Sequence, residues 1–319
     1  MTEFALNQGT TPAVDPLADD DVRRPCPAPA DFRAAVAEYD AHARVGRWAG
    51  PRYEMTYRVL GQGVPLILSP GIASTYRGYA LLLNRLSARF QTVVYDYPGE
   101  HRDDRSDLRK IRHDDLVDDV FGLIEHLGFG RVFLFGPSFG STVTLSALAR
   151  EPRRFPKAAV QGAFARREFT GAEKLALWFG RRMPGTAARL PLRDAILKYN
   201  NQSNFPDPIA DRWEFYVRQN GLTPIASMAH RLDLVSGLDL RPILPKISTE
   251  VLLLQGNEDR VVARRHFDEL RSTLSNARGV IMPLVGHQPH YTHAEAMADA
   301  IGEWFLPCNP AGCPSESRA

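Results

Sequence analysis

The sequence has few cysteines and no long apolar run. Its 319 residues include three cysteines, Cys26, Cys308 and Cys313, and all of them lie in the terminal segments. An odd number of cysteines at such places builds neither a disulfide framework nor a metal site. No stretch approaches the roughly 18 apolar residues of a membrane span, and the first residues lack the basic and apolar regions of a signal peptide. We therefore expect a soluble cytoplasmic protein whose core does not depend on disulfides.

The sequence also lacks an excess of charge of either sign. Lys and Arg together number 39 and Asp and Glu 37, so the formal net charge is +2. No basic stripe is long enough to follow a phosphate backbone, and nucleic acid is not an expected partner. Hydrophobic residues make up 44% of the chain. That is enough for a substantial buried core, in one large α/β domain or two ordinary ones.

Short continuous apolar runs predict a mostly parallel β-sheet, because such runs are typical of strands covered on both faces. They lie at residues 65–68, 92–95, 132–135, 158–160 and 251–254. Between them, apolar residues repeat at helical spacing, which predicts helices on both faces of the sheet. Residues 53–59 alternate in polarity like a strand with one wet face, and Gly61-Gln62-Gly63 then predicts a turn. We expect an antiparallel N-terminal hairpin there.

The alternation of strands and helices stops near residue 162 and resumes only at residue 251. This interval is too long for one crossover helix, so residues 164–244 are expected to form a helical insertion between two strands. Most of its large apolar residues are expected to pack inside the insertion. They are Leu175, Leu177, Trp178, Phe179, Trp213, Phe215 and Tyr216.

The remaining residues divide into a core and two tails. Residues 31–163 and 245–306 are expected to form the α/β core. Residues 1–30 mix Pro, Ala, Asp and Thr with little apolar periodicity, which predicts a disordered tail, and residues 307–319 are expected to form a flexible one.

Four aspartates, Asp114, Asp115, Asp118 and Asp119, lie in the first turns of a predicted helix. Such a run could form a metal site. Acids in the first turns of a helix also stabilise its dipole while facing solvent, and we favour that interpretation.

A serine lies on a glycine-rich turn at the end of a predicted strand. Residues 136–140 read Gly-Pro-Ser-Phe-Gly and directly follow the apolar run 132–135. A sharp strand-to-helix turn needs glycines on both sides of the serine, because the strand and the helix crowd any side chain there. The pattern alone is weak, and an ordinary tight turn is the alternative. The strand before it and the helix after it favour Ser138 as a nucleophile.

A serine hydroxyl needs a base to accept its proton and a carboxylate to orient that base. Acids follow the predicted strand 251–254, in the loop where doubly wound sheets keep their sites. Asp259 is our choice over the adjacent Glu258.

A histidine is presented in the same way beyond a predicted strand at residues 280–282. His287 directly follows a glycine there, and we choose it as the base. His290 and His293 are nearby alternatives, but neither follows the glycine at the strand end. The order Ser, Asp, His along the chain is the order expected with this serine turn.

At this point the chain resembles the α/β-hydrolase superfamily, particularly its single-domain, cap-bearing esterase and C–C hydrolase branch. The resemblance covers about residues 53–306. It includes residues 136–140, the loop 256–262 (Gly-Asn-Glu-Asp-Arg-Val-Val) and residues 286–290 (Gly-His-Gln-Pro-His). It implies an α/β-hydrolase fold in which the helical insertion is a cap over the active site.

The resemblance also implies a role for each site residue. Ser138 attacks, His287 relays the proton and Asp259 orients His287. The backbone N–H groups of Ile72 and Phe139 would form the oxyanion hole, because residues 66–72 resemble the family's strand and His-Gly-x turn. Such donors typically lower the barrier by several kcal/mol.

Two positions depart from the family's pattern. Pro70 stands where the family usually has histidine. His101 replaces the second glycine of the Asp-x-x-Gly-x-Gly turn, which spans residues 96–101. Both departures leave the triad intact and concern the local shape of the pocket rim.

Together these features predict a serine hydrolase that cleaves carboxylic esters through an acyl-enzyme. The expected partner is a small-molecule acyl ester or a related compound, and the mechanism requires no cofactor. Thioester hydrolysis, C–C bond cleavage and acyl transfer use the same constellation. A ligand-binding protein without turnover, built on the same scaffold, is a further alternative.

Overall fold

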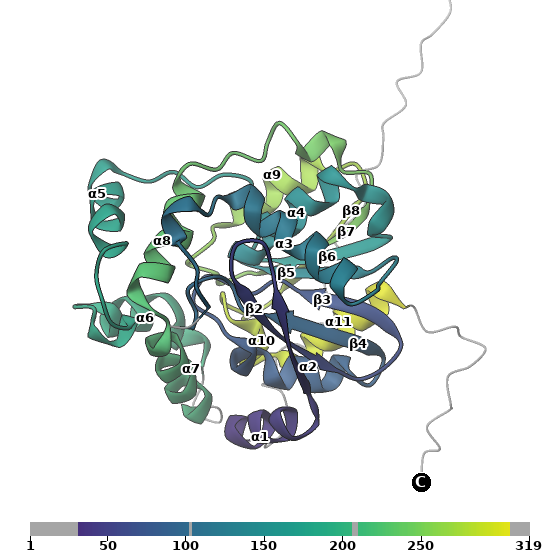
Figure 1. Cartoon of the computed structure of the whole chain (residues 1–319), viewed down its shortest axis with the longest axis horizontal. Helices are drawn as coiled ribbons and strands as arrows, with labels where there is room; N and C mark the ends of the chain where they lie inside the picture. Colours follow the sequence, from purple (N-terminus) through teal and green to yellow (C-terminus); the bar gives the residue numbers. More distant parts are fainter. Residues whose placement is uncertain (1–30, 102–103, 206–209, 307–319) are drawn as a thin grey trace, which may run out of the picture.

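The computed structural model describes residues 31–101, 104–205 and 210–306 (Figure 1). The three cysteines and the predicted tails, residues 1–30 and 307–319, lie outside these ranges. No helix within the described ranges is long and apolar enough to cross a membrane. The cytoplasmic location stays a prediction.

A single mixed sheet forms the centre of the fold. Its strands are β1 (Arg44–Ala49), β2 (Glu54–Leu60), β3 (Val64–Leu68), β4 (Phe90–Tyr95), β5 (Phe133–Pro137), β6 (Lys157–Gln161), β7 (Glu250–Gly256) and β8 (Ala277–Met282). They lie side by side in the order β1-β2-β4-β3-β5-β6-β7-β8. β2 is antiparallel to β1 and to β4, and the other pairs are parallel. The predicted mostly parallel sheet with an antiparallel N-terminal hairpin is confirmed.

The hairpin differs in detail from the prediction. β2 pairs with β1, a strand that the sequence analysis did not predict. β1 lies at the edge of the sheet and its Val45 is 63% exposed, so the strand lacks the buried apolar run by which the other strands were recognised. The glycine turn at residues 61–63 does not close a hairpin. It leads from β2 to β3, and β4 lies between those two strands in the sheet.

Helices cover both faces of the sheet (Figure 1). On one face lie α3 (His113–His126), α4 (Phe139–Arg150) and α9 (Arg264–Thr273), and on the other lie α2 (Ala80–Leu86) and α11 (Ala294–Phe305), with α1 (Phe32–His42) outside α2. Neighbouring residues of β5 show the division, because Leu134 belongs to the first apolar core and Phe135 to the second. Side chains alternate between the faces of a strand, so a continuous apolar run fills both cores.

Helices also fill the segment between β6 and β7. They are α5 (Gly171–Gly180), α6 (Arg193–Asn201), α7 (Ala210–Leu222) and α8 (Ile225–Ser236), and they lie together beyond one end of the sheet (Figure 1). A short helix, α10 (Pro289–Thr292), precedes α11. Short 3-10 turns lie at Tyr76–Tyr79, Leu108–Lys110, Pro152–Arg154, Ala187–Arg189, Gln202–Asn204 and Leu244–Lys246.

The large apolar residues of this segment do not all pack inside it, as we had expected most of them to do. Leu175, Trp178 and Phe179 on α5 are between 49% and 58% exposed, so the expectation is wrong for them. Phe215 on α7 packs instead against Phe32 of α1, with the rings tilted by 40° and their centroids 4.7 Å apart. The segment therefore contacts the core through part of its apolar surface and exposes another part.

The expectation that the four aspartates of α3 face solvent is wrong for Asp119. Its side chain is 2% exposed and accepts a hydrogen bond from Arg52 at 2.7 Å. Burial raises the pKa of Asp119 to about 6, although the hydrogen bond and the charge of Arg52 act to lower it. Asp114, by contrast, is 80% exposed.

Removing Arg52 should destabilise the fold in a pH-dependent way. The folded-state pKa of Asp119, about 6, lies above the ordinary value of 3.8. The folded state therefore holds the proton more tightly, and stability falls as pH rises through that window. Above that pH window the buried carboxylate of Asp119 is charged, and the charge of Arg52 stabilises it. Arg52→Met should lower the free energy of unfolding by on the order of 2 kcal/mol near pH 7.5 and by less near pH 5.

Urea unfolding at the two pH values measures this difference. Arg47→Met is the matched control, because its ion pair with Glu54 is exposed and should be worth less than about 0.5 kcal/mol at either pH. An equal loss for Arg52→Met at both pH values would contradict the assignment of the effect to Asp119.

Candidate active site

Ser138 occupies a strained turn between β5 and α4. Its backbone has φ 51° and ψ −119°, a combination that side-chain-bearing residues rarely adopt. Its N–H donates to the carbonyl oxygen of Gln161, at the end of β6, over 2.7 Å. The turn is thereby tied to the neighbouring strand, and the serine hydroxyl is carried off the end of the sheet.

The two glycines of the turn are required by close packing. A Cβ atom on Gly136 would overlap Thr144 and the backbone of Gly140. A Cβ atom on Gly140 would overlap the carbonyl oxygen of Ser69, at the end of β3. The strand and the helix therefore approach as closely as the sequence pattern implied.

Three side chains form a continuous chain of contacts at this end of the sheet. Ser138 Oγ lies 3.0 Å from His287 Nε2, and His287 Nδ1 lies 2.7 Å from Asp259 Oδ2. They follow β5, β8 and β7 respectively, strands that lie close together in the sheet. Their parallel strands all end at the same edge, so residues distant in sequence meet there.

Asp259 is held as a carboxylate inside the protein. Its side chain is fully buried, and its Oδ1 accepts hydrogen bonds from the N–H groups of Val261 and Val262, each at 2.8 Å. Burial acts to raise the pKa of this carboxyl. The charge and hydrogen bond of His287 together with the two backbone donors outweigh burial, so the pKa lies below its ordinary value. Asp259 can thus stabilise a positive charge on His287.

The alternative acid and bases lie elsewhere. Glu258 accepts a hydrogen bond from Asn204 at 2.9 Å, away from the histidine. His290 is fully buried and stacks on Tyr79 with ring centroids 4.4 Å apart; burial lowers its pKa to about 3. His293 bonds to the adjacent Thr292. Of the residues weighed from sequence, the structure brings Ser138, His287 and Asp259 together.

The two backbone N–H groups named for the oxyanion hole belong to two segments that pack together near the serine. Phe139 is the first residue of α4, so its N–H lies at a helix N-terminus, where the helix dipole favours negative charge. Ile72 lies in the turn after β3, which contacts Gly140. Neither N–H has a hydrogen-bond acceptor among the described residues.

One of the two departures from the family pattern, His101, is held by a carboxylate of its own turn. His101 Nε2 lies 3.0 Å from Asp96 Oδ2, and that hydrogen bond raises the pKa of His101. Arg58 donates to the same carboxylate oxygen at 3.2 Å. The turn 96–101 is therefore held by contacts of the Asp96 carboxylate with His101 and Arg58, and His101 stands where the family has a glycine.

Sequence reasoning missed Gly162, which follows β6 beside the triad. Its φ is +54°, and a Cβ atom there would lie 2.9 Å from His287 Cε1 and 3.3 Å from Asp259 Oδ2. Only a residue without a side chain fits against the imidazole at this point. The signal in the sequence was a glycine directly after a strand end.

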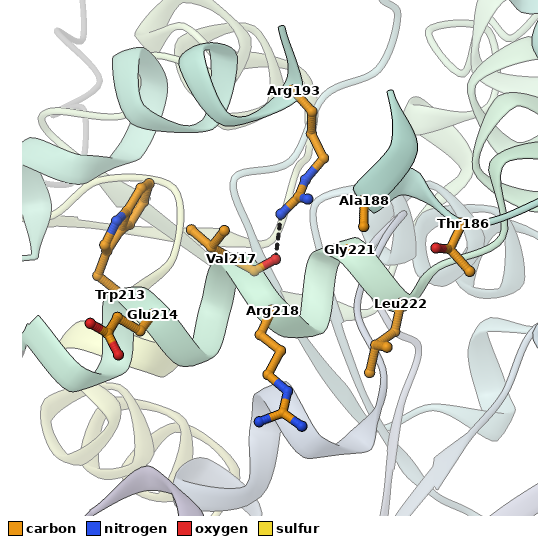
Figure 2. A pocket seen from close by; sticks show the side chains of 9 residues that line it. All are labelled: Thr186, Ala188, Arg193, Trp213, Glu214, Val217, Arg218, Gly221 and Leu222. Atoms are coloured by element: carbon orange, nitrogen blue, oxygen red, sulfur yellow. Dashed lines mark hydrogen bonds between the residues drawn. The ribbon is translucent and has the colours of Figure 1, made fainter. Parts of the chain in front are cut away.

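Two of the surface hollows among the described residues lie away from the serine. One, of about 430 Å³, lies against α7 and contains Trp213, Arg218 and Leu222 (Figure 2). The other, of about 600 Å³, is arginine-rich and includes Val261 and Val262 of the acid loop. None of the three triad side chains lines either hollow. Among the described residues, no group of three or more His, Cys, Asp or Glu is placed to hold a metal ion.

Comparison with known proteins identifies the family. A family model for the alpha/beta hydrolase fold matches residues 64–294. The chain belongs to the α/β-hydrolase family. The match includes the serine turn, the acid loop and the histidine, and it confirms the predicted fold and the resemblance from which it was drawn.

Several relatives of this α/β hydrolase are named as hydrolases. It is 24% identical to a proposed carbamate hydrolase of Pantoea ananatis, over 82% of this chain and 98% of that protein. It is 24% identical to the 2-hydroxymuconate semialdehyde hydrolase of Pseudomonas sp. strain CF600, over 79% and 90%. The solved enol-lactonase from Burkholderia xenovorans LB400 matches with a TM-score of 0.71 at 22% identity, over 82% and 99%. The prediction of a hydrolase is confirmed.

Gly162→Ala should impair this site more than it impairs the fold. The new methyl group would press on His287 and strain a backbone with positive φ, at about 1 kcal/mol of stability. If His287 acts as the base, turnover of an activated ester should fall by roughly 10-fold or more, because small displacements of a catalytic group lower the rate strongly. Gly237→Ala is the control, since a Cβ atom there meets nothing within 4 Å. Unchanged turnover in a folded Gly162→Ala variant would contradict the tight fit.

Proposed function

We propose that this α/β hydrolase cleaves carboxylic esters through an acyl-enzyme formed on Ser138. The observation that carries the proposal is the chain of contacts from Ser138 Oγ to His287 Nε2, at 3.0 Å, and from His287 Nδ1 to Asp259, at 2.7 Å. A hydroxyl, an imidazole and a buried carboxylate in that order are what acyl transfer to serine requires.

The proposed reaction has two halves. As Ser138 Oγ attacks the ester carbonyl, its proton moves to His287 Nε2, and Asp259 stabilises the resulting imidazolium. The negative charge on the carbonyl oxygen is stabilised by the N–H groups of Ile72 and Phe139. His287 then gives the proton to the departing alkoxide, which leaves as an alcohol. Water attacks the acyl-enzyme in the same way and releases the acid.

The helical insertion, residues 164–244, is proposed as a cap on the core formed by residues 31–163 and 245–306. Contacts between the two support this division. Asn204 bonds to Glu258, beside the catalytic acid, and Arg212 Nη1 donates to the carbonyl oxygen of Tyr291 at 2.9 Å, shortly after the catalytic histidine. The insertion thus lies against the loops that carry the triad.

Esters are favoured within the family because Ser138 supplies an acyl-accepting hydroxyl and because the enol-lactonase, by its name, opens an internal ester. The semialdehyde hydrolase keeps C–C bond cleavage open as an alternative, and thioester hydrolysis and acyl transfer use the same residues. Product analysis with a competing alcohol separates transfer from hydrolysis. Failure of Ser138 to react with a serine-directed phosphonate would favour a ligand-binding protein instead.

Ser138→Ala should abolish ester turnover while leaving the fold intact, because it removes one hydroxyl. The measurement is turnover of a panel of p-nitrophenyl esters, thioesters and aryl amides, which also reports the reaction class and the preferred acyl length. Ser272→Ala, an exposed serine on α9, is the matched control and should retain full activity. Turnover near the wild-type rate in purified Ser138→Ala would contradict the assignment of Ser138 as the nucleophile.

Asp259→Asn and Glu258→Gln form a matched pair of neighbouring substitutions. Asp259→Asn should lower kcat by on the order of 10³–10⁴-fold, because the amide no longer holds His287 in the right tautomer. Glu258→Gln should change kcat by less than about 5-fold, since Glu258 bonds to Asn204 and not to the histidine. The reverse order of effects would show that the wrong acid has been named.

A further inference from the structure

One arginine of the insertion bonds both to the turn after β3 and to the turn 96–101. Arg231, on α8, donates through Nη1 to the carbonyl oxygen of Ile72 and through Nη2 to the carboxylate of Glu100. The side chains of Arg231 and Glu100 are 2% and 7% exposed. The forked guanidinium can bond two acceptors at once, which a lysine ammonium does with less geometric control.

The turn after β3 has few hydrogen-bond donors of its own to stabilise its conformation. Pro70 has no N–H to donate, so this turn lacks a backbone donor that other residues would supply. Its anchors come from outside. The N–H of Gly71 donates to the hydroxyl of Tyr79 at 3.0 Å, and the carbonyl of Ile72 accepts from Arg231.

These two anchors enclose the peptide unit that carries the Ile72 N–H. The Gly71 N–H belongs to the peptide unit before it, and the Ile72 carbonyl belongs to the unit after it. Peptide units are planar, so the unit between them can turn only through the dihedral angles at Gly71 and Ile72. Holding both neighbouring units restricts those angles. The direction of the Ile72 N–H therefore depends on Arg231.

The same arginine contacts the other side of the oxyanion site through an aromatic ring. Its guanidinium carbon lies 5.3 Å from the ring centroid of Tyr97. Tyr97 in turn meets Phe139 edge to face, with ring centroids 5.3 Å apart. Both residues whose N–H groups are proposed to bind the oxyanion are thus packed around one buried cluster.

We propose that Arg231 is a positioning residue for the oxyanion hole, holding the Ile72 N–H in its productive direction. The proposal rests on the proposed function, because it takes the Ile72 N–H as an oxyanion donor. Ser227, one helical turn earlier on α8, donates to the carbonyl oxygen of Gly99 at 2.6 Å, so the same face of α8 holds both rim turns. The insertion then contributes to stabilising the transition state as well as to covering the substrate.

Glu100 serves as the counter-charge that allows Arg231 to be buried. Burial raises the pKa of Glu100, and the charge and hydrogen bond of Arg231 act against that rise. Removing Arg231 alone would leave a buried, unpaired carboxylate, which would confuse loss of positioning with loss of stability. The test therefore uses a background in which this charge is already gone.

The experiment compares Glu100→Gln with the double variant Glu100→Gln, Arg231→Met. The single variant keeps the bond from Arg231 to Ile72, and the double variant loses it. Between the two, kcat for a p-nitrophenyl ester should fall by roughly 10–100-fold while KM changes by less than about 3-fold. Affinity for a trifluoromethyl ketone, which forms an oxyanion on Ser138, should fall in parallel with kcat.

Arg181→Met is the control for a merely structural role. Arg181 pairs with Asp233 and joins α5 to α8 within the insertion, so its loss loosens the insertion without touching the Ile72 turn. It should leave kcat and affinity for the ketone near their wild-type values. Arg231→Lys, which keeps the charge beside Glu100, should have an intermediate kcat.

Several outcomes would overturn the proposal. The same kcat in the single and double variants, or a change confined to KM, would show that Arg231 does not act on the oxyanion. If the double variant does not fold, a wild-type kcat in Arg231→Lys overturns it. Phosphonate labelling of Ser138 in the wild-type protein separates these results from failure of the proposed function. If Ser138 is labelled, the outcomes above test Arg231 alone; if it is not labelled, the proposed function fails, and the role of Arg231 fails with it.

Discussion

The backbone of Ser138 is held at φ 51° by the bond from its N–H to Gln161 and by the close packing of α4 on β5 and β3. A strained residue persists only where its surroundings fix it. Here the surroundings are the two glycines of the turn, which let α4 approach the end of β3. The same approach brings the N-terminus of α4 beside the turn that carries Ile72, so one packing contact places both the proposed nucleophile and the proposed oxyanion donors.

Asp259 and His287 are positioned by a second set of close approaches. A Cβ atom on Gly256 would overlap the backbone of Val285, and one on Gly286 would overlap Asn204. The loops after β7 and β8 therefore touch backbone to backbone, with a residue of the insertion against them. Contacts of that kind leave little freedom for the His287 ring, which Gly162 contacts from β6. Preorganisation of this sort makes electrostatic stabilisation effective.

Local chemistry made the larger part of the fold and the candidate site predictable. Ser138, Asp259 and His287 each follow a strand end, and parallel strands bring such ends together whatever the distance in sequence. The features that the sequence did not predict depend on contacts with residues far away in the chain, which no local pattern indicates. Asp119 lies where acids ordinarily face solvent, and its burial requires Arg52, 67 residues earlier. The bonds from Arg231 to Ile72 and Glu100 span more than a hundred residues and leave no periodic trace.

Besides its aromatic contacts, the insertion meets the core through three buried polar contacts near the site. Arg231 to Glu100, Arg212 to Tyr291 and Asn204 to Glu258 all cross between the two. An apolar interface tolerates sliding, but a buried charge that loses its partner is strongly destabilised. These contacts therefore favour one position of the insertion over a range of positions. Because two of them end beside Asp259 and shortly after His287, displacing the insertion would also disturb the contacts of the proposed triad.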